Sequence, residues 1–154
     1  MIVYRIADKN YIDDREGTGA KLFGGRWNEI NDPCIYTSEN VSLAFLEKFV
    51  HARFKENMEN IGILTIEIPD KTDALLHVNT EQLQLDWKNN VAYTQWIGKQ
   101  LLEDNDIVAF SVPSVIIPSE RNYIINPRSK YFKQVKYKTI SDFTSDYRLL
   151  ATLL

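Results

Sequence analysis

The amino-acid sequence predicts one α+β domain, in which two main helices are set among short strands of a small mixed sheet. Its 154 residues let a single domain bury about two-thirds of the surface that the unfolded chain exposes. The stretch at about 39–54 shows the three- and four-residue apolar spacing of a helix, and Asn90 can cap a second helix over 91–103. The stretch 62–68 alternates as strands do. We therefore expect one domain over 1–154.

The first half of the chain predicts a strand, a long loop, a second strand and the first helix. Residues 2–6 (IVYRI) form the opening strand. The polar, glycine-bearing segment 7–25 is expected to be a loop, which at this length is usually functional or mobile. A short strand over 34–37 follows. Ser38 is expected to cap the helix over 39–54, which has acids early and bases late, as the helix dipole favours.

The second half predicts a strand, the second helix and several short strands. The strand over 62–68 stops at Pro69. Asn90 is expected to cap a helix that runs through Glu103. This helix contains Gly98, which costs ~1 kcal/mol inside a helix and would permit another segment to approach closely. The remaining predicted strands are 107–112, 115–117, 123–125 and 135–138.

The composition disfavours several classes of protein. The chain is 44% apolar and 25% charged, and it has no apolar run of the ~18 residues that a membrane helix needs and no signal-peptide pattern. The net charge of -3, with both signs mixed along the chain, gives little reason to bind nucleic acid directly. The one cysteine, Cys34, fits a reducing cytosol. We expect a cytoplasmic protein that binds neither membranes nor nucleic acid.

Glu47 is the most informative candidate for a functional residue. Leu43, Leu46, Val50 and Phe54 form one apolar stripe on the predicted helix, and Glu47 lies in the middle of it. Burying a carboxylate costs several kcal/mol unless a cation or a ligand hydroxyl compensates. The residues alone leave two interpretations open, a functional acid that faces a cleft and an acid that finds a gap to solvent.

The segment 24–28 (GGRWN) is the second candidate. Glycines such as Gly25 let a ligand approach the backbone, and Arg26 can fork onto a phosphate or a carboxylate. Trp27 offers either a stacking face or a core anchor. The alternative is a tight turn whose arginine pairs structurally with an acid such as Glu47.

Tyr36 and Ser114 complete the candidate set. Tyr36 can stack on a flat ring, although a strand tyrosine more often packs with its hydroxyl satisfied. Pro113 and Pro118 keep the backbone around Ser114 extended, so the serine hydroxyl can hold a ligand amide or orient a carboxylate. The alternative is a solvent-facing serine. No G-x-S-x-G context supports a serine nucleophile.

Other chemistries are disfavoured by the sequence. The phosphate-binding loop and the G-x-G-x-x-G pattern are absent. His51 and His77 lack the spacing of metal ligands, so we expect no metal site. A nucleophilic pair of Cys34 with a histidine stays open, although Cys34, between a proline and an isoleucine, resembles a small buried hydrophobe.

Taken together, these segments resemble the RES domain, the toxin component of RES–Xre toxin–antitoxin modules. The motifs that carry the likeness are VYR at 3–5, GTGA at 17–20, GGRWN at 24–28, IYTS at 35–38, FLE at 45–47, QWIG at 95–98, VPS at 112–114, NY at 122–123, NP at 126–127 and DYRL at 146–149. Each motif is weak alone. In this order they cover nearly the whole chain, and the combination is specific.

The resemblance implies which residues form the site. The family is named for an Arg, a Glu and a Ser, which match Arg26, Glu47 and Ser114. Ser119 is a rival for the serine, and Ser114 is preferred because Val-Pro precedes it. Tyr36 matches the tyrosine that the family places in the same pocket. The residues expected to contact the ligand are Arg5, Gly25, Arg26, Trp27, Tyr36 and Ser114.

The resemblance also implies a fold related to ADP-ribosyltransferases and an enzyme that uses NAD⁺ as substrate, without a bound cofactor. Positive charge builds on the ribose when the nicotinamide–ribose bond breaks, so Glu47 is expected to stabilise it. Arg26 would hold phosphate or ribose oxygens and Tyr36 the nicotinamide, while Ser114 orients an amide or Glu47. The expected function is cleavage of NAD⁺ with water or phosphate as acceptor, which depletes cellular NAD⁺ and arrests growth. Transfer of ADP-ribose to a protein and a non-enzymatic binding module are the alternatives. An Xre-type antitoxin and a homodimer are the implied partners.

Overall fold

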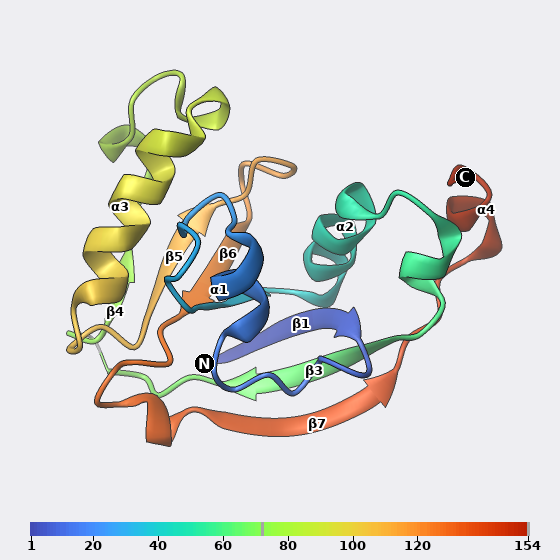
Figure 1. Ribbon diagram of the computed structural model, residues 1–154, viewed down its shortest axis with the longest axis horizontal. Coiled ribbons are helices and arrows are strands. Elements are labelled where there is room, and N and C mark those ends of the chain that lie inside the picture. The colour runs from blue at the N-terminus through green and yellow to red at the C-terminus, as the bar shows by residue number, and fades with distance from the viewer. Residues whose placement is uncertain (72, 154) are drawn as a thin grey trace.

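A mixed β-sheet runs through the computed structural model, which describes residues 1–71 and 73–153 (Figure 1). In this described part the sheet has seven strands in the order β4-β5-β6-β2-β1-β3-β7. The strands are β1 (Ile2–Asp8), β2 (Ile35–Ser38), β3 (Ile61–Glu67), β4 (Leu75–His77), β5 (Ala109–Pro113), β6 (Arg121–Ile125) and β7 (Lys136–Asp142). β4 and β5 are parallel, and the other neighbours are antiparallel. The predicted α+β class is confirmed.

The sheet is weakly joined in its middle. β1 pairs with β3 along its whole length, from Ile2↔Glu67 to Asp8↔Ile61. By contrast, the described residues of β1 and β2 pair at one position, Tyr4↔Ser38. Figure 1 shows the consequence, because β1, β3 and β7 run together while β5 and β6 take a different direction. The sheet therefore consists of two halves that diverge from the β1–β2 boundary.

Four α-helices occur among the described residues, and two of them are long. They are α1 (Thr18–Phe23), α2 (Val41–His51), α3 (Val91–Glu103) and α4 (Tyr147–Leu150). Short 3-10 turns lie at Lys55–Met58, Thr80–Gln82, Trp87–Asn89 and Phe132–Gln134. The prediction for α3 is confirmed, including Asn90 as its cap, whose side chain accepts from the Tyr93 amide at 3.1 Å. None of these helices is long and apolar enough to cross a bilayer.

The start of the first long helix was predicted wrongly. Asn40 caps α2 by accepting from the Leu43 amide at 2.8 Å, whereas Ser38 is the last residue of β2. The helix also ends at His51 rather than near residue 54. Because the hydroxyl of Ser38 donates to Asn122 on β6, it serves the sheet and not the helix terminus.

Three further predictions need correction. The predicted loop 7–25 contains α1, which has no buried residue and follows Gly17 in a left-handed conformation (φ 69°). The predicted strand 115–117 is a turn, because the Ser114 hydroxyl accepts the Ile116 and Ile117 amides at 3.0 and 3.1 Å. β4 was missed, since it has three residues and lies in a weakly patterned stretch.

Each long helix packs on a different half of the sheet. α2 buries Ala44 and Phe45 against Ile6 of β1. On the other half, α3 buries Leu102 in a cluster with Phe110 of β5. Burial of this apolar surface holds the helices in place. This packing places α2 beside β1 and β2, which form the boundary between the two halves of the sheet.

Candidate active site

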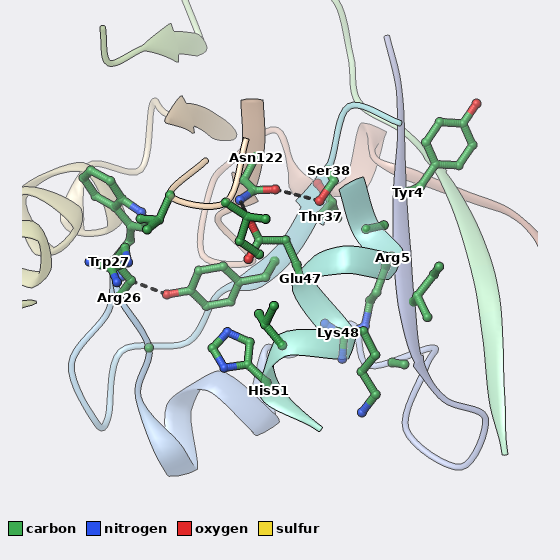
Figure 2. A pocket seen from close by; sticks show the side chains of 18 of the residues that line it. Tyr4, Arg5, Arg26, Trp27, Thr37, Ser38, Glu47, Lys48, His51 and Asn122 are labelled. Carbon is green, nitrogen blue, oxygen red and sulfur yellow. Dashed lines mark hydrogen bonds between the residues drawn. The ribbon is translucent and has the colours of Figure 1, made fainter. Parts of the chain in front are cut away.

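A cavity of about 700 Å³ lies where the two halves of the sheet diverge. Its walls come from β1, the turn 24–27, β2, α2, the turn after β5, and Asn122 of β6. The volume is within the usual range of small-molecule sites. Figure 2 shows Glu47 in the middle of this pocket, with Arg26 and Trp27 on one side and Arg5 and Lys48 on the other.

Glu47 is held by neutral hydrogen-bond donors. Its side chain is half-buried, and Oε1 accepts from Ser114 Oγ at 2.9 Å and from Asn122 Nδ2 at 2.6 Å. No described residue forms a salt bridge with this carboxylate, and none hydrogen-bonds to Oε2. The two donors offset the cost of partial burial. Glu47 therefore faces the cavity with one oxygen fixed and the other available to a ligand.

Ser114 hydrogen-bonds to the Glu47 carboxylate and does not line the cavity. The residue is fully buried, and its hydroxyl donates to Glu47 while accepting two backbone amides from the turn that follows. The expectation that Ser114 contacts a ligand directly is therefore corrected, and of its two expected roles the structure supports the orientation of Glu47. The rival, Ser119, is exposed and outside the cavity lining.

The turn 24–28 is fixed by α3. The Thr94 hydroxyl and the Gln95 amide donate to backbone carbonyls of the turn at 2.5 and 2.9 Å. A Cβ at Gly98 would lie 1.6 Å from the Trp27 carbonyl oxygen, so the helix and the turn are in backbone contact. The close approach that the sequence suggested at Gly98 is confirmed, and it sets the position of one cavity wall.

The aromatic residues of the turn region have different roles. Trp27 lines the cavity, but it is 3% exposed and packs on Trp87 with ring centroids 5.9 Å apart, as a core anchor does. The Tyr36 hydroxyl donates to Asn28 Oδ1 at 2.7 Å and accepts from the Trp27 amide at 3.1 Å. A Cβ at Gly25 would meet this hydroxyl at 2.6 Å. Burial raises the pKa of Tyr36 well above its usual value, so the phenol stays neutral.

Cationic side chains lie on both sides of Glu47. The Arg26 guanidinium donates to the Lys88 carbonyl at 2.8 Å, and no salt bridge joins it to Glu47 in the described part of the chain. Arg5 Nε is buried and has no hydrogen-bond partner among the described residues. Burial lowers the pKa of both Arg5 and Lys48. Cations that are removed from water favour an anionic ligand, and such a ligand would supply the hydrogen-bond acceptor that Arg5 Nε lacks.

Sequence reasoning missed Asn122 as a partner of Glu47. The asparagine reaches the site because β2 and β6 pair in the register Ser38↔Asn122, which no local pattern reveals. Its one signal was membership of the NY motif at 122–123. Lys48 and His51 also line the cavity. Lys48 was not a candidate, and His51 was considered only as a metal ligand or as the partner of a cysteine.

The structure gives no support to a nucleophilic cysteine. Cys34 is 2% exposed and lies outside the cavity lining. Burial raises the pKa of its thiol to about 12, so the reactive thiolate is scarce at neutral pH. Within residues 1–71 and 73–153, no three His, Cys, Asp or Glu side chains are grouped as metal ligands would be.

We expect Cys34 to resist alkylation in the folded protein. Treatment with iodoacetamide at about pH 8 should leave the native protein unmodified, because the thiol is both inaccessible and protonated. The same reagent should label it fully in denaturant. Intact-mass measurements follow the modification. Rapid labelling of the native protein would contradict the buried placement of this thiol.

Comparisons with known proteins give a consistent picture. The model of the RES domain family matches residues 2–148. A protein from Photorhabdus laumondii named Toxin Res is 38% identical in an alignment of 154 positions that covers 97% of each chain. A Sphingobium protein named Prs ADP-ribosylating toxin is 34% identical over 90% of this chain and 88% of its own length.

A solved structure shares the fold. A chain of the M. tuberculosis MbcT–MbcA toxin–antitoxin complex superposes with a TM-score of 0.76 at 22% identity, covering 99% of this chain and 87% of that chain. The superposition includes almost every residue of this chain, so the similarity is one of the whole fold. With a family model over nearly its whole length and relatives above 30% identity, the chain belongs to the RES domain family.

Proposed function

We propose that this protein is the toxin of a toxin–antitoxin pair and that it cleaves NAD⁺ at the bond between nicotinamide and ribose. The observation that carries the proposal is the state of Glu47, whose Oε1 is held by two neutral donors while Oε2 faces a cavity flanked by cations. A dinucleotide with two ribose rings and a negatively charged diphosphate matches this distribution of charge.

The geometry suits a dissociative cleavage. The C1′–N bond breaks with its electron pair going to nicotinamide, which leaves as a neutral molecule. The positive charge that develops on the ribose is stabilised by the nearby carboxylate of Glu47. Water or phosphate then adds at C1′, giving ADP-ribose and a proton, or the corresponding phosphate ester. The leaving group already carries positive charge in NAD⁺, so Glu47 need not transfer a proton.

The other cavity residues bind and orient the substrate. Arg5 and Lys48 lie on one side of Glu47 and Arg26 on the other (Figure 2), and these cations hold phosphate or ribose oxygens. The Tyr36 ring lines the cavity and provides an apolar surface for nicotinamide, because its hydroxyl is engaged elsewhere. Fixing the substrate against the carboxylate supplies much of the rate enhancement.

The role as a toxin is supported by the relatives. Proteins from Photorhabdus laumondii and Yersinia enterocolitica are named Toxin Res, and the structural neighbour comes from a toxin–antitoxin complex. We propose an antitoxin of the Xre type as the partner, covering the cavity. A homodimer and a cytoplasmic location, where NAD⁺ is available, complete the proposal.

A second candidate is transfer of ADP-ribose to a protein. It is favoured by the name of the Sphingobium relative, Prs ADP-ribosylating toxin. The two reactions share the cleavage step, so the same residues serve both. They differ in the acceptor, which is water or phosphate in one case and a protein side chain in the other.

Controlled expression in bacteria tests the proposed function. The wild-type chain should deplete cellular NAD⁺ and arrest growth, while Glu47→Gln and Arg26→Ala should be tolerated at equal soluble expression. Growth arrest at unchanged NAD⁺ level, with a protein that becomes ADP-ribosylated, would favour the second candidate. Normal growth and unchanged NAD⁺ with soluble wild-type protein would contradict both enzymatic functions.

A further inference from the structure

We propose that Asn122 and Ser38 are positioning residues for Glu47, forming a hydrogen-bonded relay that decides which carboxylate oxygen meets the substrate. The inference deepens the proposed function and depends on it for its kinetic consequences. Figure 2 shows Asn122 between Ser38 and Glu47. The three side chains come from β6, β2 and α2, so the relay joins the helix to the sheet half that contains β6.

The hydrogen-bonding capacities of the three groups define the direction of the relay. A carboxylate accepts hydrogen bonds and cannot donate them, so the amide nitrogen of Asn122 must face Glu47, at 2.6 Å from Oε1. The amide oxygen of Asn122 then faces Ser38, which must donate, and the two oxygens are 2.6 Å apart. Ser38 is 3% exposed, so water does not compete freely for its hydroxyl.

The relay makes the two oxygens of Glu47 unequal. Oε1 accepts one hydrogen bond from Asn122 of β6 and one from Ser114, which follows β5. These two bonds use both lone pairs of that oxygen. Within the described residues, Oε2 receives no hydrogen bond. A ribose hydroxyl that enters the cavity therefore meets Oε2, and the orientation of the carboxylate is set before the substrate binds. Preorganisation of this kind strengthens electrostatic catalysis.

Asn122 and Ser38 act through Glu47 even though both line the cavity. Each end of the Asn122 amide has a protein partner, and the Ser38 hydroxyl is directed at that amide. We therefore expect substitution of Asn122 to change kcat much more than KM. Asn122→Ala should lower kcat roughly 10- to 100-fold, because a hydrogen bond to a charged group is lost. Ser38→Ala should lower kcat by a smaller factor, and Ser38→Thr should have the wild-type kcat because it keeps the hydroxyl.

Asn122→Asp tests the relay through the pH dependence of kcat, which would not change if Asn122 had only a structural role. It places a second carboxyl beside Oε1, and such a pair keeps one proton to higher pH than an isolated carboxyl does. While that proton remains, the introduced carboxyl group donates as the amide did. Once it is lost, the two charges repel. The variant should therefore retain kcat at low pH and lose it as pH rises, unlike wild type. The other ionisable groups that line the cavity on neighbouring elements, among them Arg5, Arg26, Lys48 and His51, are common to both proteins.

The experiment measures kcat and KM for nicotinamide release from NAD⁺ across pH, together with crystal structures of wild type and Asn122→Ala. Ser129→Ala is the matched control, since its buried hydroxyl donates to the Asn105 carbonyl away from the cavity, and its kcat should equal that of wild type. The relay is supported by a kcat-specific loss and a reoriented Glu47 in Asn122→Ala.

Two outcomes would overturn the inference. One is a wild-type kcat in Asn122→Ala, or a pH profile of Asn122→Asp that is parallel to that of wild type. The other is a Glu47 side chain in the wild-type position in the crystal structure of folded Asn122→Ala. If the wild-type protein releases no nicotinamide, the proposed function fails instead, and the crystal structures still decide whether Asn122 positions Glu47.

Discussion

Replacing Glu47 by glutamine should lower the rate of NAD⁺ cleavage by at least roughly 100-fold, as removal of one preorganised electrostatic group does in other enzymes. Glutamine keeps the size of the side chain and one oxygen that can accept from Ser114 and Asn122. It lacks the negative charge that stabilises the developing positive charge on ribose. Initial rates of nicotinamide release by the purified proteins, followed by liquid chromatography, measure the effect.

Stability measurements separate this loss from misfolding. Glu47→Gln should unfold at the same temperature as wild type or slightly above it, because a half-buried charge is removed. Glu56→Gln makes the same chemical change at an exposed position outside the cavity and should leave the rate unchanged. Turnover retained in Glu47→Gln would contradict the catalytic assignment, and marked unfolding would make Glu47 a structural residue.

Gly98→Ala should have the largest effect on stability. The added methyl group would lie 1.6 Å from the carbonyl oxygen and 2.6 Å from the carbonyl carbon of Trp27. Both are backbone atoms, so either α3 or the turn 24–28 must shift. Overpacking of this kind costs about 1–3 kcal/mol, or more where the backbone cannot yield. Because the turn carries Arg26, substrate binding should weaken as well.

A second glycine is the matched control for this substitution. Gly19 lies in α1, and a Cβ added there would have nothing within 4 Å, so Gly19→Ala should leave stability unchanged or raise it by up to ~1 kcal/mol. Urea denaturation of the two variants and of wild type gives the comparison. Equal stability of Gly98→Ala and wild type would show that the contact between α3 and the turn is not as tight as described.

The sequence predicted the helices and strands that local sequence features specify. α3 was predicted from its Asn90 cap, and β3 from strict alternation. α1 was missed because it buries no residue and therefore has no apolar periodicity to detect. The segment 115–117 has the composition of a strand, but a hydroxyl from outside the segment, that of Ser114, takes two of its amides. Local composition does not reveal such competition.

In the candidate site, too, the sequence predicted residues with a local signal but not the contacts between distant segments. Glu47 was identifiable because a carboxylate interrupts an apolar stripe, which is a property of one helix. Its contact with Asn122 depends on the register of two strands far apart in the chain, so no helix pattern predicts it. Likewise, opposite charges suggested that Arg26 pairs with Glu47, but the guanidinium donates to the Lys88 carbonyl. Lys88 is far away in the sequence, so only the folded structure reveals this contact.

A crystal structure of Glu47→Gln with NAD⁺ tests the central claim most directly, because the slow variant preserves the substrate. We predict that the ribose attached to nicotinamide lies within hydrogen-bonding distance of residue 47, with the diphosphate against cavity cations such as Arg5. NAD⁺ bound away from residue 47, or a cavity that stays empty at saturating NAD⁺, would contradict this prediction.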